Sequence, residues 1–276
     1  MTEKTYIKRY SKIHRLFHIF IVLTFMNQAV TGFSFLFITT DLGEKLSQLL
    51  GGYKTSFFLH KLGGVLMITG FLIHIMYLLS KIDRRNLKAS IFGPDSLVPN
   101  LQDIQHLLQR VLSFFGFGSL PKIDRWAYWE KFGYWGVFWG MPLLGITGVM
   151  LMFPLLVCRV VSGWTLNVAA LLHRAEAILA VSYLFIIHFF FGHFSPSKFP
   201  LNEAMFSGRV ELEELIEERL AWVERMQKEG KIELIKANAP NPWYRALYFI
   251  FGYAALACGF YIIIKGIDYS RYIKLH

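Results

Sequence analysis

Residues 57–79, FFLHKLGGVLMITGFLIHIMYLL, decide the fold of this chain, because they form an apolar run interrupted by a single lysine. About 20 apolar residues are enough for a helix to cross a bilayer. Four further runs reach that length, at residues 16–38, 132–157, 164–194 and 243–264. The sequence therefore predicts an all-α membrane protein, in which a four-helix transmembrane bundle is followed by a fifth, C-terminal transmembrane helix.

The composition excludes several classes of protein. The chain of 276 residues is 54% hydrophobic and only 17% charged, whereas soluble domains carry about 25% charged residues. Its formal net charge of +10 comes from basic residues in the connections between the apolar runs, as is typical of membrane-flanking loops. An ordinary soluble enzyme, a disordered chain and a nucleic-acid-binding module are therefore excluded.

The cysteines exclude further chemistry. Cys158 and Cys258 are the only two cysteines, and neither lies in a CxxC or CxxCH motif. The sequence thus offers no disulfide framework, no thiolate metal site and no attachment site for a c-type haem. Any cofactor must be held by other side chains.

Basic residues also predict the orientation in the membrane. They are concentrated before the first run, between the second and third runs, and after the fourth, and loops of this kind stay in the cytoplasm. We therefore expect a multi-pass protein of the bacterial cytoplasmic (inner) membrane, with its N-terminus in the cytoplasm and its C-terminus outside. The first run is too long for a signal peptide, so we expect it to be retained.

The chain divides into three expected domains. They are a four-helix domain over residues 1–195, a cytoplasmic charged helical segment over 196–242, and a fifth transmembrane helix with an outer tail over 243–276. Residues 97–115 alternate apolar and polar side chains at helical spacing, which predicts a helix on the cytoplasmic surface. Residues 209–238 predict a charged helix, either solvated or docking a partner subunit.

Four histidines inside the runs are spaced so that they can pair. His60 and His74 are fourteen residues apart, and His173 and His188 are fifteen apart. In an α-helix these spacings return to within about 40° and about 60° of the starting direction, so each helix presents two imidazoles on one face. The second and fourth helices run in the same direction, which places His60 level with His173 and His74 level with His188. Two facing imidazoles can take both axial positions of a haem iron, which predicts two stacked haems across the bilayer.

Because His18 is a second candidate, the sequence does not determine which histidine pairs with His188 at the inner site. It enters the first helix from the cytoplasmic side, at a depth that also matches His188. Either His18 or His74 pairs with His188, or one of the two serves a quinone, or a third haem is present. His14 and His193 lie one turn further out and could ligate such a haem.

Residues near these histidines fit a porphyrin. Arg15, Lys61 and Arg174 lie beside the candidate ligands, where they could pair with haem propionates or serve as interfacial anchors. Glycines allow backbone to come close to a haem or to a neighbouring helix. They recur in the first three helices, as Gly32, Gly63, Gly64, Gly70, Gly136, Gly140, Gly145 and Gly148.

An ordered set of short motifs resembles the di-haem cytochrome b membrane subunits of formate dehydrogenases and Ni-Fe hydrogenases. The motifs are RLFH at 15–18, TGF at 31–33, LH at 59–60, ITGV at 146–149 and LLH at 171–173, and the resemblance covers about residues 8–195. It implies an outer haem b ligated by His60 and His173, an inner haem b ligated by His18 and His188, and a quinone site near the inner haem.

The chain departs from that family in two respects. His74 is an additional inner histidine, and the fourteen and fifteen spacing also resembles the cytochrome b of bc complexes. Residues 195–210 (SPSKFPLNEAMFSGRV) and the fifth helix look more like b-type subunits that work with multihaem c cytochromes. The expected partner is therefore a periplasmic multihaem cytochrome c, or else an iron-sulfur or catalytic subunit.

The resulting expectation is an electron-transfer subunit of a quinone-linked oxidoreductase complex, using menaquinone or ubiquinone and two, or at most three, haems b. Asn27 and Gln28 in the first helix could bind a quinone or bond another helix, and Glu176 could relay a proton or pair with a basic residue. A proton-coupled transporter could use the same histidines as relays, but the sequence shows no repeat. A cofactor-free membrane anchor would not need matched histidines.

Overall fold

The computed structural model describes residues 4–195, 198–199 and 201–273, and it forms two compact units. One, which we call the histidine unit, comprises Leu16–His74, Trp139–Asn202 and Ala246–His276. The other, which we call the sheet unit, comprises Met1–Arg15, Ile75–Phe138 and Glu203–Arg245.

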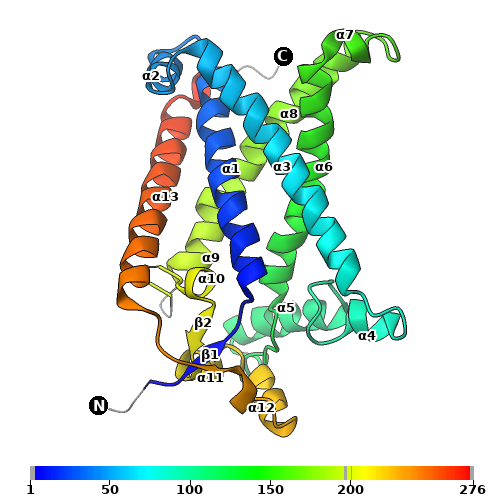
Figure 1. The fold of residues 1–276 in the computed structure, drawn as a ribbon, viewed down its shortest axis with the longest axis vertical. Helices are drawn as coiled ribbons and strands as arrows, with labels where there is room; N and C mark the ends of the chain where they lie inside the picture. The colour runs from blue at the N-terminus through cyan, green and yellow to red at the C-terminus, as the bar shows by residue number, and fades with distance from the viewer. Residues whose placement is uncertain (1–3, 196–197, 200, 274–276) are drawn as a thin grey trace. The chain divides into compact units, whose positions relative to one another are not determined.

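Within the described residues, five helical spans are long and apolar enough to cross a membrane. They are α1 (Lys12–Leu36), α3 (Tyr53–Lys81), α6 (Tyr128–Met152), the continuous span Trp164–His193, and α13 (Pro242–Asp268) (Figure 1). The predicted architecture, a four-helix bundle followed by a fifth transmembrane helix, is confirmed. Helices α1, α3 and α6 begin four residues before the predicted runs, whereas α6 ends five residues early, at Met152, because Phe153 leaves the helix and Pro154 begins the next one.

The fourth span is not a regular α-helix throughout. It consists of α8 (Trp164–Ser182), a π-helical turn η1 (Tyr183–His188) and α9 (Phe189–His193). A π-turn is wider than an α-turn because each N–H bonds five residues back, and such turns are frequent at functional sites. This one ends on a histidine of the predicted site.

Helix α13 packs in the histidine unit through a stripe of glycines. A Cβ at Gly252 would lie 2.7 Å from the Leu201 side chain, and one at Gly259 would lie 2.6 Å from Phe189. Large side chains of the neighbouring segments therefore fill the space that the glycines leave. This is the small-residue packing expected between helices in a membrane.

Short helices close the ends of the long ones. Helix α2 (Asp41–Leu49) is capped by Thr40 and buries Leu42 and Leu46, while its other face is exposed. Helix α7 (Pro154–Val157) lies between α6 and α8. A short 3-10 turn, η3 (Ser270–Tyr272), follows α13.

The sheet unit contains a three-stranded antiparallel sheet with the N-terminal strand in the centre. Strand β1 (Tyr6–Lys8) pairs with β2 (Arg209–Glu211) on one side and β3 (Lys236–Ala237) on the other. The sheet covers a small apolar core, composed of Ile7, Ala204, Val210, Leu215, Trp222, Val223 and Met226.

The prediction of one charged helix over residues 209–238 is wrong. The segment forms β2, α11 (Leu212–Glu218), α12 (Leu220–Lys228), the 3-10 turn η2 (Glu233–Ile235) and β3, after the short helix α10 (Ala204–Ser207). Arg219 interrupts the helix with a φ of −137°. Its side chain is only 1% exposed and reaches Glu130, so burial of this arginine takes precedence over helix propensity.

Two buried arginines share one carboxylate in the sheet unit. Oε1 of Glu130 lies 2.7 Å from Arg9 and 3.1 Å from Arg219. Burial lowers the pKa of Arg9, but the negative charge of Glu130 opposes this, and its guanidinium stays charged with a net raised pKa. Removing one member of a buried ion pair is costly, so this cluster fixes the N-terminal segment against α6.

The expected helix at residues 97–115 is confirmed as α5 (Leu101–Phe114), which follows the short helix α4 (Leu87–Phe92). Asn100 and Asp103 form a capping box at its start. Asp103 also pairs with Lys131 at 2.9 Å, and both side chains are buried. The apolar face of the helix remains exposed, including Leu101 and Leu108.

Candidate functional site

The structure brings His60 and His173 together in the histidine unit. His60 lies on α3 and His173 on α8, and their ring centroids are 6.3 Å apart with the planes at 75°. The rim of Phe35 packs on His60 with ring centroids 5.5 Å apart. The two histidines that the sequence places at the outer depth therefore face each other.

Each of these imidazoles is held by a threonine of the neighbouring helix. Oγ1 of Thr31 on α1 lies 2.8 Å from Nδ1 of His60, and Oγ1 of Thr147 on α6 lies 3.0 Å from Nδ1 of His173. Both threonines are buried. With Nδ1 engaged in this way, Nε2 is the ring nitrogen left for a metal.

The glycine that follows each threonine lies against the same histidine. A Cβ at Gly32 would be 3.7 Å from Cε1 of His60, and a Cβ at Gly148 would be 3.3 Å from Cε1 of His173. Each Thr-Gly pair thus supplies a hydroxyl and an open backbone surface to one imidazole.

This geometry fits the axial ligands of a haem. A metal-bound imidazole nitrogen lies about 2 Å from the metal, so two rings that share one iron from opposite sides have centroids about 6 Å apart. Among the described residues, no group of three or more His, Cys, Asp or Glu is placed to hold a bare metal ion. Two imidazoles suffice for haem, because the porphyrin occupies the remaining positions.

The π-turn changes the expected register of His188. Because η1 contains one residue more than an α-helix would need, the fifteen residues from His173 to His188 cover roughly the rotation of fourteen. The offset is then about 40°, as for His60 and His74 on the regular α3. His188 is therefore better aligned with His173 than a regular helix would make it.

Several histidines gather at the inner depth. His18 on α1 lies in the same region of the histidine unit as His188 and His193. The rings of His188 and His193 are perpendicular, with centroids 6.1 Å apart. His74 packs its ring on the edge of Phe17, with centroids 4.7 Å apart. His18 and His188 are thus both available at this end of the histidine unit, as is His74.

His193 is oriented differently from the other candidate ligands. The backbone N–H of Asn202 donates to its Nδ1 at 3.2 Å, so in a neutral ring the proton lies on Nε2. An Nε2 that carries a proton donates a hydrogen bond and does not ligate iron. His14, the other histidine considered for a third haem, has its Nδ1 2.9 Å from the hydroxyl of Ser11.

The two candidate propionate partners make backbone contacts. Arg15 donates from one terminal nitrogen to the carbonyls of Phe206 and Ser207 at 2.7 and 3.1 Å. Its Nε is buried, has no hydrogen-bond partner among the described residues and faces Gly208. Arg174 donates from Nε to the carbonyl of Ala170, one turn earlier on α8.

The polar residues considered for quinone binding are engaged within the bundle. Asn27 donates to the carbonyl of Leu59 on α3 and to Gln28, both at 3.0 Å. These amides lie over Gly63, where a Cβ would collide with the side chains of Asn27 and Gln28. Glu176 faces Gly140 on α6. Asn27 therefore makes the interhelical bond rather than facing an open site.

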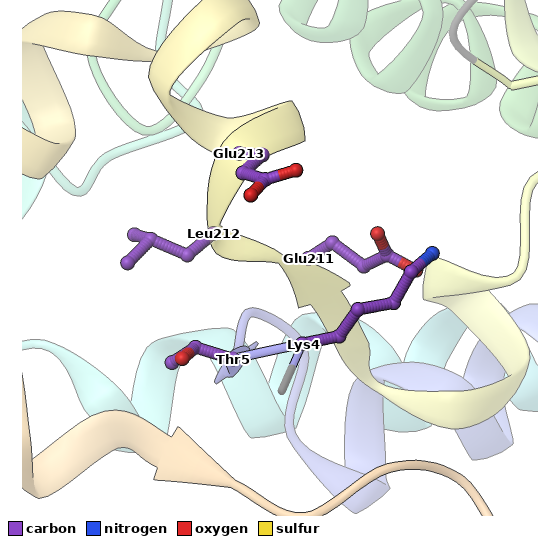
Figure 2. A pocket seen from close by; sticks show the side chains of 5 residues that line it. All are labelled: Lys4, Thr5, Glu211, Leu212 and Glu213. Atoms are coloured by element: carbon purple, nitrogen blue, oxygen red, sulfur yellow. The ribbon is translucent and has the colours of Figure 1, made fainter. Parts of the chain in front are cut away.

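A shallow pocket in the sheet unit is lined by Lys4, Thr5 and Glu211–Glu213 (Figure 2). Figure 2 shows the ammonium group of Lys4 beside the carboxylate of Glu211, and the two form an ion pair at 2.8 Å. No histidine lines this pocket, so it does not belong to the candidate site.

Sequence reasoning did not assign Thr31 and Thr147 a role, although both lie in motifs that carried the family resemblance. Each threonine is 26 or 29 residues from the histidine that it contacts. The signal in the sequence was the Thr-Gly dipeptide. It occurs on two helices, and in each case the next long helix carries a candidate histidine ligand.

Comparison with known families identifies the family of the chain. A family model described as prokaryotic cytochrome b561 matches residues 9–208, well over half of the chain. No curated protein matches the chain. The predicted b-type cytochrome is confirmed, and a haem b fits the facing imidazoles. The chain belongs to the prokaryotic cytochrome b561 family, and it is a multi-pass membrane protein of the b-type cytochromes that transfer electrons.

Proposed function

We propose that this cytochrome is the membrane subunit of a quinone-linked oxidoreductase complex, related to the cytochrome b subunits of formate dehydrogenases and Ni-Fe hydrogenases. It passes electrons between menaquinone or ubiquinone and a partner redox protein outside the membrane. That partner is a multihaem cytochrome c, or an iron-sulfur or catalytic subunit. Haem held in the bundle supplies the one-electron chemistry that links the two-electron quinone to such a partner.

The observation that carries this proposal is the His60–His173 pair. The two rings face each other at 6.3 Å, and each has its Nδ1 bound to a threonine. We assign these histidines as the axial ligands of the outer haem. Arg174 follows His173 directly on α8, and we assign it to a propionate.

The inner haem is assigned to His18 and His188. The family resemblance implies this pair, and both residues lie in the histidine unit. His74 packs on Phe17, the residue before His18. Arg15 lies one turn before His18 on α1, and its place in the sequence is the reason to assign it to a propionate. The chain then holds two haems, and His74 remains as the alternative inner ligand.

A quinone site beside the inner ligands is supported by His193. Its Nδ1 accepts the Asn202 amide, so its Nε2–H is available to a quinone carbonyl oxygen. Its ring lies 6.1 Å from that of His188, which places the donor next to a proposed haem ligand. This role takes the place of ligation of a third haem.

The proposed orientation follows the basic residues. The N-terminus and residues 196–242 lie in the cytoplasm, and the end of α13 lies outside the inner membrane. Residues 1–195 then form the haem-carrying part, and residues 243–276 add the fifth helix. Positions 196, 197 and 200 of the connecting stretch, and 274–276 of the tail, lie outside the described residues.

The test is haem content and spectrum of the purified protein. Dithionite reduction is expected to give a b-type α-band, and pyridine haemochrome to give two haems per chain. His60→Ala and His173→Ala are each expected to lose the same haem, which halves the content. His106→Ala, on α5 outside the spans, is the control and keeps both haems.

Two outcomes contradict the proposal. A wild-type protein without a b-type spectrum would exclude the cytochrome function for this chain. A full haem content in either His60→Ala or His173→Ala would remove the outer ligand pair. Quinol-driven haem reduction in membrane vesicles then tests the quinone link separately from haem binding.

A further inference from the structure

Two buried threonines bond the outer histidines in the same way. Thr31 contacts His60 at 2.8 Å and Thr147 contacts His173 at 3.0 Å, in both cases through Oγ1 and Nδ1. Thr31 is 0% exposed and Thr147 is 4% exposed. Water therefore does not compete for either hydroxyl.

Each threonine hydroxyl also bonds a backbone carbonyl, and this bond determines which group is the donor in the contact with the histidine. Oγ1 of Thr31 donates to the carbonyl of Asn27 at 2.6 Å, and Oγ1 of Thr147 donates to the carbonyl of Leu143 at 2.6 Å. A hydroxyl has one proton to give, and a carbonyl oxygen can only accept it. The contact with the imidazole must then run from the ring Nδ1–H to the threonine oxygen.

We propose that Thr31 and Thr147 are positioning residues that hold both outer histidines as the Nδ1–H tautomer and lower the reduction potential of the outer haem. This inference rests on the proposed ligation by His60 and His173. Each threonine leaves Nε2 with its lone pair and aims it away from the threonine. Each also fixes the ring plane, because the bond to Nδ1 opposes rotation about χ2.

The direction of the effect on the potential follows from the hydrogen bond. An imidazole that donates its second N–H to an acceptor becomes a more basic ligand. A more basic axial ligand favours ferric over ferrous iron, which makes the potential more negative. Two such bonds act on the same iron, one from each side.

The inner side offers a contrast within the same molecule. Among the described residues, no threonine hydroxyl contacts the ring of His188, whose neighbours include Phe189 and His193. The two haems would then differ in reduction potential because the hydrogen bonds of their imidazole ligands differ, although both have two such ligands.

Thr24 provides a matched control on α1. It is buried, and its Oγ1 donates to the carbonyl of Phe20 at 2.9 Å, one turn earlier. This is the same back-bond that Thr31 makes, but without a histidine. Replacing Thr24 therefore removes a buried hydroxyl from the same helix while leaving both histidine contacts in place.

The experiment compares Thr31→Val, Thr147→Val, Thr31→Ser, Thr147→Ser and Thr24→Val by redox titration of the purified haem protein. Valine keeps the branched shape and removes the acceptor, whereas serine keeps the hydroxyl. Each valine variant at 31 or 147 is expected to raise the outer-haem midpoint, by up to tenfold in the ferric-to-ferrous ratio, about 59 mV for one electron. The serine variants and Thr24→Val are expected to stay near the wild-type value.

Electron paramagnetic resonance of the ferric protein gives a second readout. The g-values of a haem with two imidazole ligands depend on the angle between the rings, so loss of either threonine bond is expected to shift the outer-haem signal. A shift in the valine variants with recovery in the serine variants supports the proposal. Loss of the outer haem in the valine variants alone also supports it, because only the hydroxyl differs.

Other results overturn it. They are an unchanged midpoint and signal in both valine variants, an equal shift in Thr24→Val, or serine variants that behave like valine. Absence of haem from the wild-type protein would instead contradict the proposed function, so the two failures are distinguishable.

Discussion

The helix pairs α1–α3 and α6–α8 contain the same contact between a Thr-Gly pair and a histidine. In each, a Thr-Gly pair on the first helix serves a histidine on the second, as Thr31-Gly32 with His60 and Thr147-Gly148 with His173. The bond lengths differ by only 0.2 Å (2.8 against 3.0). The outer site is thus symmetric in construction, although the surrounding sequences differ.

The pairs differ toward the inner side. Helix α3 is α-helical throughout, whereas the fourth span passes through the π-turn η1 before His188. Helix α1 also carries His18, and α6 carries no histidine. The comparison teaches that the two ends of the bundle are built differently. The proposed inner ligands come from a π-turn and from α1, whereas the proposed outer ligands occupy equivalent positions on α3 and α8.

The largest expected effect comes from changing the number of residues between histidines. Deleting Leu66 from α3 rotates the parts of the helix on either side by about 100°, which is expected to abolish the outer haem. Deleting Ile186 from η1 removes the extra residue of the π-turn, so a regular helix keeps His173 and His188 aligned and both haems stay. Pyridine haemochrome measures both variants. Equal losses would show that η1 does not set the register.

The second prediction separates His18 from His74. His18→Ala is expected to lose the inner haem, leaving one of two, whereas His74→Ala is expected to retain both. Haem stoichiometry and the midpoint of the remaining haem identify which site is empty. The opposite pattern would assign the inner pair to His74 and His188, and loss of one haem in each variant would indicate three haems.

A smaller effect is expected where the two Thr-Gly pairs differ. Gly148→Ala puts a Cβ 3.3 Å from His173, whereas Gly32→Ala puts one 3.7 Å from His60, an ordinary contact. Both variants gain the same helix propensity. Gly148→Ala is expected to cost about 1 kcal/mol through crowding, which corresponds to about fivefold weaker retention of the outer haem. Competition with apomyoglobin measures it, and equal retention by both variants would contradict the expectation.

The smallest effect concerns a contact of α2, the short helix in the connection between α1 and α3. The hydroxyl of Tyr269 donates to Asp41 of α2 at 2.6 Å. This hydrogen bond lowers the pKa of Asp41 and raises the pKa of Tyr269 to about 12. The contact is therefore lost as pH falls through the lowered pKa of Asp41, or rises through about 12, and is constant between roughly pH 5 and 9.

Tyr269→Phe is expected to speed hydrogen–deuterium exchange in α2 slightly at pH 7, with no change in haem content. Both groups are exposed to solvent, so the effect is limited by solvent screening. The turn at α7 serves as the internal control. Faster exchange at α7 as well would mean that the substitution acts beyond the Tyr269–Asp41 contact.

The spans were predictable because a bilayer imposes a length that a run of apolar residues displays directly. The facing of His60 and His173 was also predictable, since both lie on regular helices and helix periodicity determines their depth and face. The π-turn was not, because nothing in Tyr183–His188 (YLFIIH) distinguishes five-residue from four-residue hydrogen bonding. The rotation predicted for His188 was therefore too large.

The threonine contacts and the sheet could not be predicted from the sequence, for a different reason. Thr31 and Thr147 bond residues on a different helix, and only tertiary structure determines such contacts. The strands have two or three residues each, too few to show the alternation that identifies a strand. Their charged surroundings favoured a helix, and the pairing with β1 overrode that preference.

The central position of β1 has a consequence for biosynthesis. Tyr6 pairs with Glu211 and with Ala237, so its second partner follows 231 residues later (237 − 6). At about 5–20 residues per second, the N-terminal segment waits roughly 10 to 50 seconds for β3. During that time four spans can enter the membrane, and the sheet closes only as the ribosome reaches α13. The first strand synthesised is thus among the last to be placed.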